Sequence, residues 1–353
     1  MNMIDSSNAK EHSYPVYGRQ FISYKWYKPV LVFILFTLFY LILSVALVIG
    51  VAVFLGNGSI NGSVSETASG VFSQSYDDMD LANAWQSVVN LGSVAVMIPA
   101  LWLAAKIVRD RPFSSYSSAR GGWNGKVFWK SLLVSVICLA VPMIIKDLFV
   151  EHRINDFDMK FTLTSFAVVT ILGPLQCIGE EYAFRGLLMQ TFGSWFKVPV
   201  IAVIIQALVF MSMHPYDTVG KIGIIASGLV FAFTAWIGRG IEVSSAYHVV
   251  NNMTISYLQG MNLTEISSST TVKDLIFELC TGALYVLVIF IISKKTDWFS
   301  KIKREDAAEW NQRIEDKIAR KEAKAEAKAE KKAAKEGPVG AHDESAPGKH
   351  FKN

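Results

Sequence analysis

Two adjacent carboxylates, Glu180 and Glu181, occupy a stretch that is otherwise apolar, and Arg185 follows four positions after Glu181. An ionised group in a membrane persists only with a partner, in a wet cavity or for a function. The spacing of four puts Glu181 and Arg185 on one helix face, where they can form an ion pair. Glu180 points about 100° away and has no expected partner within the helix, so we predict that it is free for acid–base chemistry.

Two further patterns follow along the chain, each with a spacing of four. Phe210 and His214 share one helix face, and His248 and Asn252 share another. An imidazole N–H and an amide N–H directed at one point can stabilise an oxyanion. An intramembrane histidine or asparagine alone is as often a hydrogen bond between helices. Three patterns in succession, all in apolar segments, favour a catalytic site.

The elements that must position these residues are membrane helices. The 353-residue chain is 52% hydrophobic and only 18% charged, whereas soluble domains carry roughly a quarter charged residues. Apolar segments long enough for helices predict an all-α, polytopic membrane bundle with about eight transmembrane helices. These segments are 29–56, 86–107, 127–149, 161–179, 198–213, 221–237, 241–258 and 274–293.

Loop charges predict the orientation of the bundle. The leader, the loop 106–130 and the residues after 293 carry Lys and Arg, whereas the loops 57–85 and 258–272 have neither. Because positively charged loops stay in the cytoplasm, both termini are predicted to be cytoplasmic, in a cell membrane. The net charge of +4 comes mainly from these edges and the tail, so nucleic acid is not an expected partner.

Composition predicts five regions along the chain. They are a cytoplasmic leader at 1–28, N-terminal transmembrane helices at 29–158, a core with the three patterns at 159–258, the last transmembrane helix at 259–295, and a charged cytoplasmic tail at 296–353. The tail is rich in Ala, Lys and Glu, and we expect a solvated helix supported by opposite charges one turn apart, followed by disorder. Cys138, Cys177 and Cys280 lie in apolar stretches and are expected to be buried.

The three patterns resemble the signature motifs of one family. Glu-Glu-x-x-x-Arg at 180–185, Phe-x-x-x-His at 210–214 and His-x-x-x-Asn at 248–252 are similar to those of the CAAX protease and bacteriocin-processing family, the Abi or type II CAAX prenyl endopeptidase group of intramembrane proteases. The resemblance covers roughly 160–258 and implies peptide-bond hydrolysis within the membrane.

The resemblance also implies a role for each residue. Glu180 and His214 would activate a water molecule, and His248 and Asn252 would bind the developing oxyanion. Glu181 and Arg185, with Phe210, would support the site. The expected partners are the lipid bilayer and a peptide or lipidated protein substrate.

The sequence is compatible with a zinc-dependent and with a metal-free mechanism. The family is commonly labelled a metalloprotease group, and Glu180, His214 and His248 could supply three ligands to a zinc ion. The sequence has no His-Glu-x-x-His motif, and a glutamate-dependent mechanism needs no metal. We favour the metal-free chemistry, with zinc as the alternative.

Two other functions compete with the protease. Broken helices with buried charges also occur in transporters, although no second copy of the motif region is present. A catalytically silent immunity or scaffold protein of the same fold is the other alternative. The segment boundaries pose one difficulty, since they place Glu180 at a helix end unless that helix continues to about Phe192.

Overall fold

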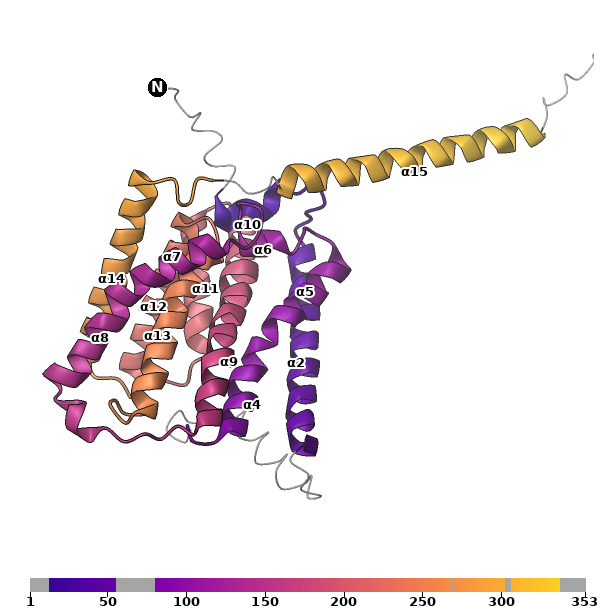
Figure 1. The fold of residues 1–353 in the computed structure, drawn as a ribbon. Coiled ribbons are helices and arrows are strands. Elements are labelled where there is room, and N and C mark those ends of the chain that lie inside the picture. The colour runs from indigo at the N-terminus through magenta and orange to yellow at the C-terminus, as the bar shows by residue number, and fades with distance from the viewer. Residues whose placement is uncertain (1–12, 55–79, 268, 302–305, 337–353) are drawn as a thin grey trace, which may run out of the picture. The chain divides into compact units, whose positions relative to one another are not determined.

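The computed structural model describes residues 13–54, 80–267, 269–301 and 306–336. The chain divides into two compact units, Met1–Trp310 and Asn311–Asn353. In the described residues all regular elements are helices, apart from an isolated bridge between Ser118 and Gly240. The predicted all-α polytopic bundle is confirmed (Figure 1). Parts of the leader, of the loop 57–85 and of the tail lie outside the described ranges.

The first unit is built from helices in the following order: η1 (Tyr14–Gln20), α2 (Lys28–Phe54), α4 (Ala84–Ala95), α5 (Met97–Val108), α6 (Ser114–Ser117), α7 (Gly125–Ser135), η3 (Val136–Ala140), α8 (Val141–Ile145), η4 (Lys146–Val150), η5 (Arg153–Asp156), α9 (Leu163–Glu181), η6 (Tyr182–Met189), α10 (Gln190–Phe196), α11 (Pro199–Ser212), α12 (Thr218–Ile237), α13 (Ile241–Gly260) and α14 (Val272–Lys295). The helix α15 (Asp306–Glu336) begins in this unit and continues through the second.

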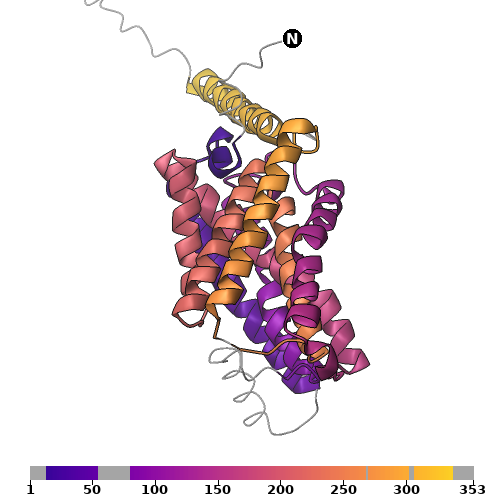
Figure 2. The same ribbon diagram turned by 90° about the vertical axis from the view of Figure 1, so that its left-hand side faces the viewer.

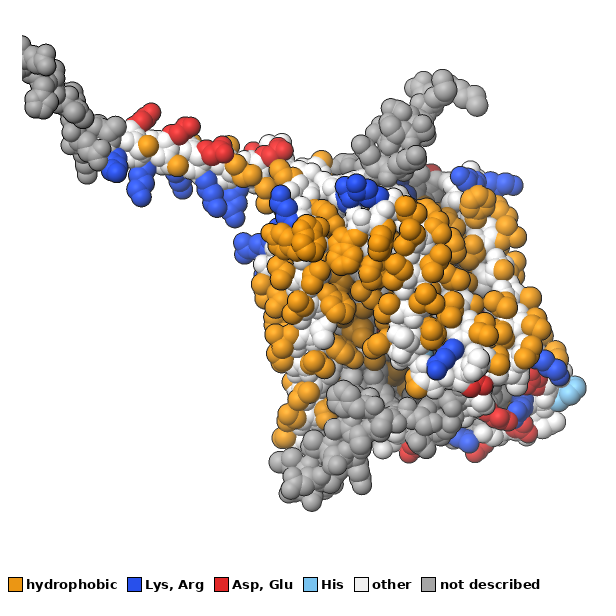
Figure 3. All heavy atoms as spheres, turned by 180° about the vertical axis from the view of Figure 1, so that it is seen from behind, with side chains coloured by type: hydrophobic (Ala, Val, Ile, Leu, Met, Phe, Trp, Pro, Cys, Tyr) orange, Lys and Arg blue, Asp and Glu red, His pale blue; other side chains and the backbone are white. Residues whose placement is uncertain are grey.

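Six helical runs in the described residues are long and apolar enough to cross a membrane. They are Lys28–Phe54, Ala84–Val108, Gly125–Val150, Leu163–Phe196, Thr218–Ile237 and Val272–Lys295. About eight transmembrane helices were predicted, so the number of candidate spans is smaller than expected. The segments 198–213 and 241–258 do form helices, but α11 has only 14 residues and α13, with 20 residues, carries the polar motif. Figure 2 shows the packed helices, and Figure 3 shows hydrophobic side chains over most of the face of the bundle in view, as lipid contact requires.

The helix that carries the two glutamates is longer than the apolar pattern indicated. The apolar segment's end at residue 179 is wrong, whereas the alternative of a helix that continues to about Phe192 is close, because α9 continues through the π-helix η6 into α10 as one run of 34 residues that ends at Phe196. Pro174 lies within α9 and does not end it. Glu180 therefore lies near the middle of the run, and the π-helical turns begin two residues later. Such turns are frequent at functional sites.

The loop between α5 and α7 fixes the start of α13. Arg120 forms an ion pair with Glu242 at 2.8 Å, and both side chains are fully buried. The same carboxylate accepts a hydrogen bond from the backbone N–H of Asn124 at 2.8 Å. Because an unpaired buried charge is strongly destabilising, this pair anchors the helix that carries His248 and Asn252.

The N-terminal segment lies across the end of the bundle at which α2 begins. Arg19 donates a hydrogen bond to the carbonyl of Ser194 at 2.9 Å, and Trp195 donates one to the carbonyl of Trp26 at 2.8 Å. Trp310, the last residue of this unit in the sequence, donates to the hydroxyl of Ser23 at 2.7 Å. The start of α15 is thereby held at the same end of the bundle.

The described part of the second unit is the remainder of α15, which confirms the predicted helix but not its predicted stabilisation. Between 317 and 332, charged residues three or four positions apart carry the same sign. Lys324, for example, has Arg320, Lys321 and Lys328 as its charged one-turn neighbours. The expectation of opposite charges one turn apart is therefore wrong for 317–332, although such pairs begin before this stretch, as that of Asp316 and Arg320 does.

The cysteines divide into two buried and one exposed residue. Cys138 and Cys177 are buried, as expected, whereas Cys280 is exposed on α14. The expectation for Cys280 is wrong because α14 lies at the outside of the bundle, where Leu279 and Leu284 beside it are also exposed. Apolar side chains in a membrane helix are not necessarily in the protein core, since lipid contact suits them as well.

Candidate active site

The motif residues come from three regions of the bundle. Glu180 and Glu181 end α9, His248 and Asn252 lie on successive turns of α13, and His214 follows the end of α11. Gly179 allows α9 to approach α4 closely, because a Cβ there would lie 3.0 Å from the carbonyl oxygen of Val94.

Glu181 and Arg185 form the ion pair that their spacing predicted. Nη1 of Arg185 lies 2.9 Å from Oε1 of Glu181, and both side chains are completely buried. The guanidinium also donates to the carbonyl of Gly228 in α12 at 3.3 Å, and it lies 4.7 Å from the ring centres of both Phe210 and Phe231. A buried cation needs this degree of compensation. The pair therefore joins α9 to α11 and α12.

His248 lies between the two glutamates. Its Nδ1 is 3.1 Å from Oε1 of Glu181, and its Nε2 is 3.6 Å from Oε2 of Glu180. The imidazole stacks on Phe231 at 4.5 Å with an interplanar angle of 18°. Because the Glu181 carboxylate that pairs with Arg185 can only accept, Nδ1 of His248 carries the hydrogen. Nε2 then faces Glu180 with a lone pair, or with a second proton if the ring is an imidazolium.

Glu180 has a partner that the sequence interpretation did not foresee. The side chain of Gln176, one turn earlier in α9, donates a hydrogen bond to Oε1 of Glu180 at 2.6 Å. The expectation that Glu180 has no partner within its helix is therefore wrong. Its other oxygen, Oε2, is buried and has no hydrogen-bond partner among the described residues. This is the oxygen that faces His248.

Asn252 completes the cluster from the next turn of α13. Its side-chain N–H₂ lies 3.4 Å from Nε2 of His248 and 3.4 Å from the side-chain oxygen of Gln176. Its own oxygen accepts a hydrogen bond from Asn251 at 3.1 Å. The amide donors of Asn252 are thereby turned toward Gln176 and His248.

His214 contacts the aromatic ring of Phe210, which also lies near His248. Its Nδ1 is 2.8 Å from the carbonyl oxygen of Phe210, to which it donates, so the neutral ring has its lone pair on Nε2. The ring centre of Phe210 lies 4.5 Å from that of His214 and 6.2 Å from that of His248. The structure brings Glu180, His248 and Asn252 together, and His214 adjoins the ring of Phe210, which lies near both imidazoles.

The zinc alternative does not fit this arrangement. In the part of the chain that the structure describes, no group of three or more His, Cys, Asp or Glu side chains is arranged to hold a metal ion. Glu180 and His248 approach each other, but His214 does not join them as a third ligand. No step below passes through a metal.

Comparison with known proteins decides the family of this core. A family model described as Type II CAAX prenyl endopeptidase Rce1-like matches residues 162–254, a range that contains all three motifs. Residues 162–254 belong to the Rce1-like family. The resemblance noted from the motifs is thus confirmed for these residues, and the family they match is one of type II CAAX prenyl endopeptidases.

A curated relative extends the comparison without adding a function. The chain is 31% identical over 170 residues to the uncharacterized protein YyaK of Bacillus subtilis (strain 168). The alignment covers 44% of this chain and 55% of YyaK, so it spans about half of that relative's length. No solved structure matches the chain.

Two residues of the Rce1-like core were missed by sequence reasoning. Gln176 bridges Glu180 and Asn252, and Phe231 supports both His248 and Arg185. The spacing of four between Gln176 and Glu180 would have revealed the first. No pattern in the sequence distinguishes Phe231 from the other aromatic residues of the bundle.

Proposed function

We propose that this protein is an intramembrane endopeptidase that hydrolyses peptide bonds of membrane-associated or lipidated protein or peptide substrates. The residues that would act are Glu180, His214, His248 and Asn252. Glu181 and Arg185, with Phe210, would support them. We assign this activity to the core 159–258, which includes the Rce1-like residues.

The observation that carries the proposal is the environment of one carboxylate oxygen. Oε2 of Glu180 is buried without a hydrogen-bond partner and lies 3.6 Å from Nε2 of His248. Buried polar atoms are normally paired, and this one lies near the middle of a membrane-spanning run. An acceptor held in this way can take a proton from a water molecule that attacks a peptide carbonyl.

The proposed reaction balances with the residues of the site. Glu180 accepts a proton as the water oxygen bonds to the carbonyl carbon, which gives a tetrahedral intermediate with one oxyanion. The amide of Asn252 donates to that oxyanion, and His248 donates from Nε2 as an imidazolium whose Nδ1–H is held by Glu181. Glu180 then returns its proton to the leaving nitrogen as the C–N bond breaks.

His214 would act on the same water from the side of α11. Because its Nδ1 donates to the Phe210 carbonyl, its Nε2 is an acceptor that can orient an O–H of the water. The ring of Phe210 lies near both imidazoles, so this role requires the water to lie beside that ring.

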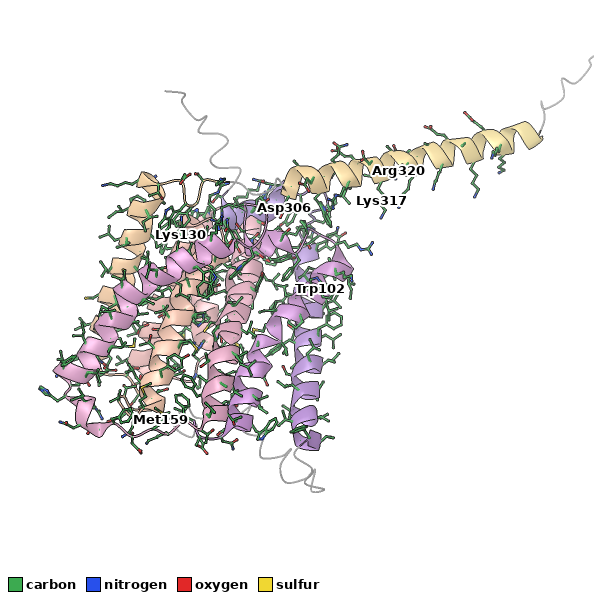
Figure 4. All side chains as sticks on the ribbon, viewed as in Figure 1. Trp102, Lys130, Met159, Asp306, Lys317 and Arg320 are labelled. Atoms are coloured by element: carbon green, nitrogen blue, oxygen red, sulfur yellow. The ribbon has the colours of Figure 1, made fainter. Side chains whose placement is uncertain are left out.

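We also propose that the basic end of the bundle faces the cytoplasm. Lys130 lies at this end and Met159 at the other (Figure 4). The ammonium of Lys130 is 4.7 Å from the ring centre of Trp298, just beyond α14, and Ser23 and Trp310 meet there as well. Lys and Arg near helix ends favour the cytoplasmic side, which supports cytoplasmic positions for both termini.

The test is a Glu180→Gln variant, compared with wild type in cells by mass spectrometry of the membrane peptides. Glutamine keeps the shape and can accept from Gln176 but cannot take a proton, so peptide termini produced by wild type should disappear, a loss of at least about 100-fold. The matched control is Glu278→Gln, which alters a half-buried carboxylate of α14 that accepts from Ser227 outside the site. Full cleavage by Glu180→Gln at normal abundance would contradict the assignment.

A further inference from the structure

The charges of α15 are separated onto two faces. At 100° per residue, the eight basic side chains between 313 and 332 fall within an arc of about 120°, and the five acidic ones between 315 and 330 fall within an opposite arc of similar width. We call the first arc the basic face; it consists of Arg313, Lys317, Arg320, Lys321, Lys324, Lys328, Lys331 and Lys332. Figure 3 shows blue side chains along one side of this helix and red ones along the other.

This separation is unfavourable for a helix alone in water. Like charges one turn apart destabilise an isolated helix, and Lys324 has three such neighbours. Lys317, Arg320, Lys321, Lys324, Lys328 and Lys331 form no ion pair within the described residues. A surface of opposite charge would relieve the repulsion along the whole face.

Apolar side chains border the basic face at its start. Ile314 and Ile318 follow Trp310 at intervals of four, so they continue one stripe beside the lysines, and Ile318 is 45% exposed. A helix with a basic face next to an apolar stripe is typical of segments that lie at a membrane surface.

The position of α15 in the chain indicates that its binding partner is the membrane. Trp310 donates a hydrogen bond to Ser23, which lies five residues before α2 begins. The helix α14 ends eleven residues before α15 begins. The helix α15 therefore starts close to the beginning of the membrane-spanning helix α2 and follows the membrane-spanning helix α14 in the chain. A tethered segment of this kind experiences a high effective concentration of the lipid headgroups next to it.

We propose that the basic face of α15 binds anionic lipid headgroups of the membrane that the bundle spans. Each Lys or Arg near an anionic surface adds to the attraction, which falls off within a Debye length. The acidic face would point away from the lipid. This binding is independent of the protease activity and needs no residue of the candidate active site.

The experiment measures amide hydrogen exchange of the full chain in nanodiscs. One set contains phosphatidylcholine alone, and the other an equal mixture of phosphatidylcholine and phosphatidylglycerol. Exchange in 311–332 should be slower by about tenfold or more in the mixed discs, and high salt should abolish the difference. The amides of the bundle serve as the internal standard.

Two variants of the helix separate the faces. Replacing Lys317, Lys321, Lys324 and Lys328 together by Gln should remove the slowing, whereas replacing Glu322, Glu326 and Glu330 together by Gln should preserve it, because Gln, Lys and Glu have similar helix propensities. Equal exchange in both kinds of disc, or slowing that survives the four Lys→Gln changes, would overturn the proposal. Slowing that appears only when RNA or an acidic peptide is added would overturn it as well.

Discussion

At the scale of single residues, the site depends on how hydrogen bonds orient one carboxylate. Gln176 donates to Oε1 of Glu180 at 2.6 Å and accepts from Asn252 at 3.4 Å, so one amide aligns both the proposed base and the proposed oxyanion donor. We classify Gln176 as a positioning residue, because it acts through its two neighbours.

A Gln176→Met variant tests this role. Methionine has a similar length but cannot hydrogen-bond to either neighbour, so Glu180 and Asn252 lose their alignment. A hydrogen bond to a charged group contributes about 1.5–3 kcal/mol, and we expect kcat to fall by roughly 10- to 100-fold with KM nearly unchanged. Steady-state cleavage of a peptide identified in the cellular comparison measures both. A rise in KM at constant kcat would instead indicate that Gln176 contacts the substrate.

At the scale of helices, the buried Glu181–Arg185 pair connects the elements around the site. Arg185 reaches Gly228 in α12, and Glu181 reaches His248 in α13. Removal of one partner of a buried ion pair costs about 3–5 kcal/mol, whereas replacement of both by apolar groups can be close to neutral. Comparing a variant that lacks one partner with a variant that lacks both therefore distinguishes the structural role of the pair from its role in catalysis.

We expect Glu181→Ala to lower the abundance of the membrane-inserted protein, because it leaves Arg185 charged and unpaired in a fully buried place. The double variant with Glu181→Leu and Arg185→Met should recover abundance and thermal stability in detergent. It should remain inactive, since Nδ1 of His248 has then lost its acceptor. A stable Glu181→Ala protein would disprove the structural role, and an active double variant would disprove the link to His248.

The helices also show how far the sequence could predict this site. Spacing within one helix was sufficient for the Glu181–Arg185 pair, because both partners lie on consecutive turns of one element. The approach of His248 to both glutamates depends on the packing of α13 against α9, which spacing does not contain. The apolar pattern alone ended this helix at residue 179, and only its continuation to about Phe192, considered as an alternative, gave Glu180 the central position that the run to Phe196 has. Hydropathy alone marks where a helix becomes polar, which need not be where it ends.

At the scale of the whole molecule, the division after Trp310 separates residues that pack against the bundle from residues of a largely exposed helix. Ala307 and Trp310 pack against the core of the bundle, and Trp310 is hydrogen-bonded to Ser23. The residues from Asn311 onward form the second unit, whose described side chains up to Lys332 are largely exposed. The first turn of α15 is therefore a part of the bundle, although its sequence resembles that of the charged tail.

Two truncations of the chain test this boundary. Ending the chain after Trp310 should leave the thermal unfolding of the detergent-solubilised bundle nearly unchanged, because the contacts of Ala307 and Trp310 are kept. Ending it after Ser300 should lower the melting temperature by several degrees, since burial of a large aromatic side chain and its hydrogen bond contribute about 2–4 kcal/mol. Trp310→Ala in the full chain is the matched control and should reproduce most of the second effect. Equal melting temperatures for both truncations would show that the bundle does not extend into α15, whereas a large loss in the first would place the boundary further along the helix.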